Sequence, residues 1–206
     1  EFGTVASWRW LVMLTLLLGN PLLQTVMMGQ LTACLLLLVT AAAWAEADDR
    51  PGLSGALVAT AAALKLFPGF LFLYFLLQRR WTALFAGAIS FVAWHGATFA
   101  IFGADTYVDW FRESLPEVLH YRDTWLNYSA TGFWYKLFEA SSGQSVPLWH
   151  SPTIARIGSL VSFVAVVLLS GYAVVRSRGD QQASRSSFAL CITAMVLATP
   201  IAWDHY

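Results

Sequence analysis

Three ionisable residues lie in or beside apolar stretches of the sequence, where a charge is costly. Lys65 stands inside ALKLFPGFLFLYFLLQRRW, residues 63–81, and Asp204 with His205 ends the last apolar stretch. An ionisable group at or inside a membrane boundary marks a functional site by default. Lysine acts as a point charge on phosphate oxygens, and histidine can move a proton near neutral pH. We therefore expect these three residues to act on an anionic substrate.

The composition indicates a polytopic membrane protein. Of 206 residues, 58% are hydrophobic and 12% charged, and the mean hydropathy is +0.60, whereas soluble domains have about 25% charged residues. The formal net charge is +0, so a nucleic-acid partner is not predicted. Cys34 and Cys191 lie in apolar runs and are interpreted as packing residues. The sequence lacks GxGxxG, GxxxxGK[ST], HExxH and CxxC patterns, so we predict neither a nucleotide fold nor a metal or cofactor.

Apolar stretches predict an all-α fold, in which one transmembrane domain covers residues 1–206. A full span needs about 20 apolar residues. The arginines at 79, 80, 176, 178 and 185 lie in short connections, which the positive-inside rule places in the cytoplasm. The predicted membrane segments are 8–28, 31–45, a hairpin of 53–66 and 68–78, then 81–102, 154–175 and 188–206, with an outer loop over 103–152.

The stretch around Lys65 can be drawn either as one span or as two short helices. We prefer the hairpin, because Pro68 lacks a backbone N–H and disfavours helix at Phe67, and Gly69 tolerates a turn. Broken helices within a membrane are tolerated where they line a polar cavity or are buried in protein. The hairpin places Lys65 toward an outward-facing cavity.

A second break is predicted in GNPLLQTVMMGQL, residues 19–31, which contains Pro21 and ends beside Gln30. Two interrupted segments that face one cavity favour a binding site, although Gly and Pro are also ordinary punctuation of membrane helices.

The outer loop is too long for a plain connection, since loops of more than about 15 residues are usually functional or disordered. YVDWFRESLPEVL, residues 107–119, has its apolar residues on one helical face and predicts an interfacial helix. GFWYKLFEA, residues 132–140, is a second candidate. The loop also contains polar residues that could bind a substrate on the outer side, among them Arg122, Asn127 and Ser129.

Four motifs occur in the order and at about the spacing seen in glycosyltransferase family 87. They are GQL at 29–31, LKLFPGFLFLYFLLQRRW at 64–81, NYSATGF at 127–133 and TPIAWDHY at 199–206. Over nearly its whole length the sequence resembles these polytopic GT-C-fold enzymes, which include polyprenol-phosphate-mannose-dependent alpha-mannosyltransferases.

The resemblance implies a multi-pass enzyme of the plasma (inner) membrane and cell envelope, with its active site on the outer, periplasmic side. Such an enzyme takes a sugar, here expected to be mannose, from a polyprenyl phosphate carrier and passes it to a lipid or glycan hydroxyl with inversion, without a cofactor. Lys65 is expected to neutralise the carrier phosphate, and His205, beside Asp204, to assist catalysis. Gln30 and Arg122 are expected to bind substrate, and Asn127 with Ser129 to orient sugar hydroxyls or hold the outer loop.

The family places its catalytic carboxylate in the first outer loop, upstream of the residues present here. We therefore expect the sequence to be a piece of a longer protein and to be inactive by itself. Asp105 and Asp109 are not assigned to that role.

The alternative function is a transporter or flippase of a lipid-linked or small anionic substrate, for which broken helices and a midplane charge are also expected. Inverted repeats would favour the transporter, and none is apparent. The long outer loop rich in Trp and Tyr favours the enzyme. A different GT-C enzyme, such as an arabinosyltransferase or an oligosaccharide ligase, is a third hypothesis.

Overall fold

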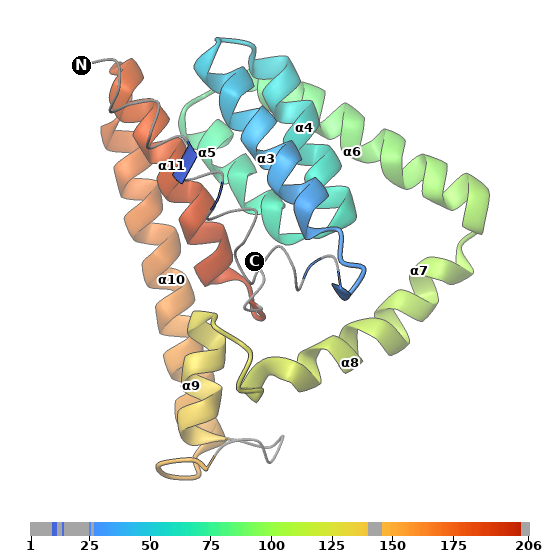
Figure 1. Cartoon of the computed structure of the whole chain (residues 1–206), viewed down its shortest axis with the longest axis vertical. Coiled ribbons are helices and arrows are strands. Elements are labelled where there is room, and N and C mark those ends of the chain that lie inside the picture. The colour runs from blue at the N-terminus through green and yellow to red at the C-terminus, as the bar shows by residue number, and fades with distance from the viewer. Residues whose placement is uncertain (1–9, 12–13, 15–24, 26, 140–145, 203–206) are drawn as a thin grey trace.

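The protein is helical throughout the part of the chain that the structure describes. The computed structural model describes residues 10–11, 14, 25, 27–139 and 146–202 (Figure 1). No strand occurs among these residues, and the helices run from α3 to α11. The predicted all-α class is confirmed for them.

Among the described residues, two helices are long and apolar enough to cross a membrane, α6 (Trp81–Phe102) and α10 (Pro152–Arg176). Helix α3 (Thr32–Ala47), helix α4 (Pro51–Leu64) and the segment Phe67–Leu77 are also apolar but shorter. Most of α6 is unburied, which fits a helix that faces lipid. These features suggest a membrane protein, and the number of spans stays a prediction.

A helix break separates α4 from α5 (Leu71–Leu77), with the 3₁₀ helix η1 (Phe67–Phe70) between them. Lys65 follows α4 in an extended conformation, with φ −145° and ψ 133°. Pro68 lies within the first two positions of η1, where its missing N–H is tolerated. The chain then reverses direction. Arg80, just after α5, pairs with Glu46 and Asp49, which lie just before the start of α4.

The core lies where α3, α4, α5 and α11 (Gln181–Ala198) meet, around Tyr74, Phe75 and Phe188. The Tyr74 and Phe188 rings meet edge to face with centroids 4.8 Å apart. Helix α4 packs on α6 through small residues, since Gly55 lies directly against the backbone of Ala83. Small residues at a helix interface let the two backbones approach closely.

The connections that contain most of the arginines gather at one end of the bundle. Arg178 donates to the carbonyl of Leu77, and Arg185 donates to the carbonyl of Ala47 at 2.7 Å. These contacts join the turns after α3, α5 and α10 at one level, which we call the arginine-rich end. The positive-inside rule assigns all of these turns to the same side of the membrane, so they must lie at one end of the bundle.

The segment after α6 forms a curved arm that returns beneath the bundle in the view of Figure 1. It comprises α7 (Asp105–Asp109), the π-helix η2 (Trp110–Ser114) and α8 (Leu115–Leu119), so the stretch predicted to be an interfacial helix is helical. The hydroxyl of Tyr107 donates to the carbonyl of His95 at 3.0 Å, which ties α7 back to α6.

The second helix of this region, α9 (Ala130–Phe138), packs on the first half of α10. The indole N–H of Trp134 donates to Ser162 Oγ at 2.8 Å. Gly158 leaves room for the Trp134 ring, because a Cβ there would overlap it. The segment predicted to be an outer loop is thus anchored on a helix long enough to span a membrane.

The last helix differs from the predicted segment 188–206 at both ends. It begins at Gln181, because the Asp180 side chain accepts hydrogen bonds from the N–H groups of Gln182 and Ala183 and caps the helix. It ends at Ala198, because Pro200 disfavours helix at Thr199, which adopts φ −64° and ψ 143°. The predicted break at Pro21 and most of the segment 8–28 lie outside the described residues.

Candidate functional site

Lys65 and Gln30, from the two predicted breaks, contact each other directly. Nζ of Lys65 donates a hydrogen bond to Oε1 of Gln30 at 2.9 Å. Gln30 is set before α3 by a turn in which Gly29 has φ +62° and the Gln30 N–H donates to the carbonyl of Thr25 at 2.9 Å. Only residues that tolerate a left-handed backbone suit position 29, and glycine does so without strain. Both side chains are half-buried, so the ammonium group stays within reach of a ligand.

Asn127 is fully buried, and its side-chain amide is fully used by the protein itself. Nδ2 donates to the carbonyls of Arg122 at 2.8 Å and Pro200 at 3.0 Å. Oδ1 accepts from the N–H groups of Ser129 and Ala202, each at 3.0 Å. An asparagine amide has two N–H donors and two acceptor lone pairs. These four bonds occupy all of them.

Ser129 and Tyr128 extend this junction. Ser129 Oγ donates to the Pro200 carbonyl at 3.0 Å and accepts from the N–H of Gly132 at 3.0 Å, so it also caps α9. The Tyr128 N–H donates to the Ala202 carbonyl at 2.7 Å. We call the contacts of residues 127–129 with residues 200–202 the loop anchor. It joins the outer loop to the segment that follows α11.

Arg122 lies beside the loop anchor in η3 (His120–Asp123). Its guanidinium carbon stands 4.6 Å from the centre of the Tyr135 ring, and Nη1 donates to the Tyr135 hydroxyl at 3.2 Å. Nε of Arg122 is buried and has no hydrogen-bond partner. A buried N–H without a partner is costly. This N–H therefore remains without a hydrogen bond inside the protein.

Lys136, on α9, belongs to the same region and was not predicted from the sequence. Its Nζ donates to the Asn127 carbonyl at 2.8 Å and lies 5.5 Å from the centre of the Tyr128 ring. Burial lowers the pKa of Lys136 from its ordinary value. Lys136 lies seven positions beyond the NYS motif, and no sequence pattern around it indicated a role.

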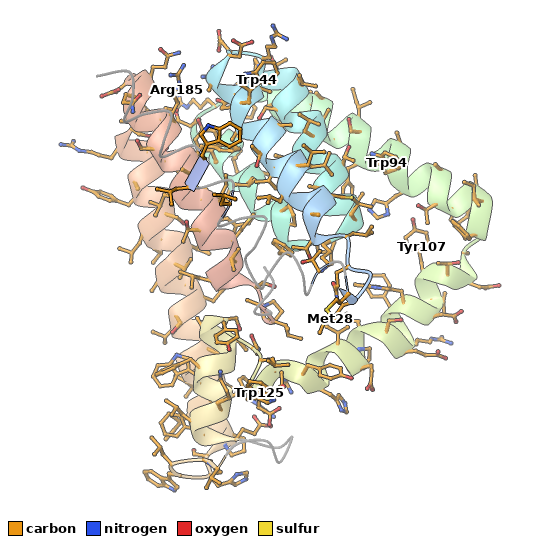
Figure 2. All side chains as sticks on the ribbon, in the orientation of Figure 1. Met28, Trp44, Trp94, Tyr107, Trp125 and Arg185 are labelled. Atoms are coloured by element: carbon orange, nitrogen blue, oxygen red, sulfur yellow. The ribbon has the colours of Figure 1, made fainter. Side chains whose placement is uncertain are left out.

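The Lys65–Gln30 contact and the loop anchor are connected through α11. This helix packs on η1, which follows Lys65, and its end leads directly into residues 200–202. Figure 2 shows Met28, which precedes Gln30, and Trp125 of the outer loop toward the same end of the molecule, away from Arg185. Asp204 and His205 lie outside the described residues, two and three positions along the chain after Ala202.

The described residues offer positive charge for an anionic ligand. Lys65 and Arg122 supply N–H donors suited to phosphate oxygens. Within the described ranges, no group of three or more His, Cys, Asp and Glu residues is placed to hold a metal ion.

Comparison with known proteins identifies the family. The model of glycosyltransferase family 87 matches residues 2–200. No curated protein and no solved structure matches the chain. Because the matched region is nearly the whole chain and includes the segments around Gln30, Lys65 and Asn127, the chain belongs to glycosyltransferase family 87.

Proposed function

We propose that this glycosyltransferase moves a sugar, mannose in the enzymes it resembles, from a polyprenyl phosphate carrier to a hydroxyl of a lipid or glycan. The observation that carries the proposal is the 2.9 Å contact between Lys65 and Gln30. It places an ammonium group at a helix break, at the end of the bundle away from the arginine-rich turns. An ammonium group so placed suits the monophosphate of a lipid carrier.

The reaction is a single displacement at the anomeric carbon. The acceptor hydroxyl oxygen forms the new bond to that carbon, the bond to the phosphate oxygen breaks, and the carrier leaves as polyprenyl phosphate. Because the donor sugar is beta-linked and the product alpha-linked in the enzymes it resembles, the configuration inverts. The step requires a general base for the hydroxyl proton and stabilisation of the leaving phosphate.

Lys65 stabilises the phosphate charge in this proposal, and Gln30 holds the ammonium group in place. The guanidinium group of Arg122 donates further hydrogen bonds to the substrate. His205, with Asp204 beside it, assists at the phosphate or the acceptor. The catalytic carboxylate that acts as the base belongs to an outer loop upstream of these residues in the longer protein.

Asn127 and Ser129 hold the outer loop, one of the two roles expected for them. The saturated hydrogen bonding of Asn127 and its complete burial support this role over direct contact with sugar hydroxyls. The loop anchor then fixes where the segment leading to Asp204 and His205 begins.

The enzyme is proposed to be a multi-pass GT-C-like protein of the plasma membrane with its site on the outer side. The arginine-rich end supports this orientation, since short connections with Lys and Arg stay in the cytoplasm. Lys65 and the outer loop then belong to the opposite side, where a lipid-borne sugar is received.

The test is transfer of labelled mannose from polyprenyl phosphate mannose to endogenous lipid by the full-length protein in membranes. Lys65→Ala should lower the rate by about 100-fold or more, as expected for loss of one group that stabilises developing charge. Lys65→Arg should keep part of the activity. The matched control is Arg112→Ala, which removes an exposed charge from η2 in the curved arm after α6. This variant should transfer mannose at the wild-type rate.

Full activity of a folded Lys65→Ala protein would remove the role of Lys65. No transfer from any polyprenyl-linked sugar by the wild type would remove the proposed donor. Movement of a lipid-linked sugar from one leaflet of a vesicle membrane to the other, without transfer of the sugar to an acceptor, would instead favour the flippase.

A further inference from the structure

Arg79 adopts a backbone conformation that is uncommon for arginine. It follows α5 at the arginine-rich end and has φ +57°. Its N–H donates to the Leu76 carbonyl at 3.1 Å, and the N–H of Arg80 donates to the Phe75 carbonyl at 2.8 Å. These two bonds form the Schellman motif, in which the left-handed position is usually glycine. A side chain at this position strains the backbone, so glycine would fit residue 79 better.

Asp49 is the other non-glycine residue with a positive φ among the described residues, at +53°. Aspartate tolerates the left-handed conformation better than arginine does, and the Asp49 carboxylate accepts from Nη1 of Arg80 at 3.2 Å. The Arg79 side chain, by contrast, is exposed and forms no ion pair with the part of the chain that the structure describes. A strained residue with a charged, exposed side chain indicates a role in binding.

The acidic side chains of the arginine-rich end already have partners. They are Glu46, Asp48, Asp49 and Asp180. The first three pair with Arg50 or Arg80, and the last accepts from two N–H groups at the start of α11. Within the described ranges, the exposed arginines without an acidic partner at this end are Arg79, Arg176, Arg178 and Arg185. This end therefore presents uncompensated positive charge.

Arg178 lies where α5 packs on the end of α10. Its Nε donates to the Leu77 carbonyl at 2.7 Å, and its Nη2 donates to the same oxygen. Nε2 of Gln78 donates to Ser177 Oγ at 2.9 Å across the same junction. These contacts place Arg178 against the turn that contains Arg79. A guanidinium group has five N–H donors, so Arg178 is held in place with N–H groups left for a ligand.

Arg176 ends an exposed apolar face of α10. Leu169 and Tyr172 precede it by seven and four positions, so the period of the helix places the three side chains on one face. Leu169 is 69% exposed and Tyr172 is 70% exposed. Trp81, directly after Arg80, is exposed as well, and Trp and Tyr are enriched where a membrane meets water. A ligand suited to this face has an anionic group at the arginines and an apolar part along Leu169 and Tyr172.

We propose that the junction of α5 and α10 binds anionic phospholipids from the leaflet at the arginine-rich end. Arg79, Arg176 and Arg178 donate to the phosphate oxygens, which guanidinium groups match with paired N–H groups. The acyl chains lie along Leu169 and Tyr172. This site requires the membrane orientation of the proposed function and is independent of the identity of the transferred sugar.

The test compares lipids that differ in the net charge of the head group. The full-length protein in detergent is titrated with phosphatidylglycerol or with phosphatidylcholine of the same acyl chains, and its thermal unfolding temperature is measured. Phosphatidylglycerol is anionic, whereas the phosphate of phosphatidylcholine is balanced by its own ammonium group. Phosphatidylglycerol should raise the unfolding temperature with a saturating dependence, and less so at high salt. Phosphatidylcholine and inorganic phosphate should not raise it.

Three variants locate the effect. Arg79→Gly removes the charge and the backbone strain together, so in phosphatidylcholine it should unfold at no lower temperature than the wild type. It should bind phosphatidylglycerol about fivefold more weakly, as expected for one basic residue near an anionic leaflet, and so should Arg176→Gln. Arg50→Gln is the matched control, because it removes the same charge from the same end but outside the junction, from a guanidinium that pairs with Asp48. It should bind like the wild type.

Equal stabilisation by phosphatidylglycerol and phosphatidylcholine would overturn the proposal, and so would equal stabilisation by inorganic phosphate, because no lipid would be recognised. An Arg50→Gln protein weakened as much as Arg79→Gly would overturn the location, since only the net charge of the end would then matter. An Arg79→Gly protein that binds phosphatidylglycerol like the wild type would remove the role of Arg79. Transfer of mannose is measured separately, so failure of this site and failure of the proposed enzyme function give different results.

Discussion

Nζ of Lys65 lies 2.9 Å from Oε1 of Gln30, although the two residues are 35 positions apart in the chain. The hydrogen bond joins the break after α4 to the turn before α3. It gives the ammonium group a fixed position beside the side-chain amide of Gln30. The mechanism proposed for this enzyme depends on that position.

Replacement of Gln30 by alanine should reduce sugar transfer by about tenfold, because the Lys65 ammonium group would lose a partner worth about 1.5–3 kcal/mol. In a Lys65→Ala background the same replacement should have little further effect, since residues in one network are not additive. Transfer rates of the two single variants and the double variant measure this coupling. Additive losses would show that Gln30 acts independently of Lys65.

Asn127→Ala should lower the free energy of unfolding by about 3 kcal/mol, because it leaves buried carbonyl and N–H groups without partners. Thermal unfolding in detergent measures the loss. Tyr128→Phe is the control, because the Tyr128 side chain is exposed and its backbone N–H remains. An Asn127→Ala protein as stable as the wild type would contradict the structural role and return the residue to the list of sugar-binding candidates.

Gly55→Ala should destabilise the bundle by about 2–3 kcal/mol, because the added methyl group would overlap the carbonyl of Ala83 on α6. Gly96→Ala is the matched change, since a Cβ at Gly96 meets nothing within 4 Å and substitutions at such sites are usually within about 0.5 kcal/mol. Unfolding temperatures of the two variants should separate clearly. Equal behaviour would mean that α4 and α6 do not pack as closely as described.

The stability of the protein should rise with pH in alkaline solution because of Lys136. Its pKa is below the ordinary 10.5, so the unfolded chain binds more protons than the folded protein between the two pKa values. Stability increases with pH wherever the unfolded state binds more protons. The unfolding temperature of the wild type, measured from about pH 8 upward, should rise relative to that of Lys136→Met.

A parallel pH dependence of the two proteins would show that the pKa of Lys136 is the same in the folded and unfolded states, which would contradict the predicted effect of burial.

Much of the architecture was predictable from local sequence. The apolar stretches gave helices near their observed limits, and Pro68 marked the break after α4, because proline acts on its immediate neighbours whatever the tertiary structure. The start of α11 was placed seven residues too late, since the stretch with Arg176, Arg178 and Arg185 was interpreted as a connection. The Asp180 cap and packing against α3 and α5 make the residues from Gln181 onward helical.

The site was only partly predictable, for a physical reason. The sequence alone determined that a lysine stands in an apolar run, that a proline follows it and that an NYS motif lies in a long loop, because these are properties of residue type and order. Only the tertiary structure decided that Gln30 contacts Lys65, and that the side-chain amide of Asn127 is saturated by backbone groups of Arg122, Ser129, Pro200 and Ala202. Each of those depends on which distant segments pack together, and packing sets the hydrogen-bond partners that a polar side chain has left for a ligand.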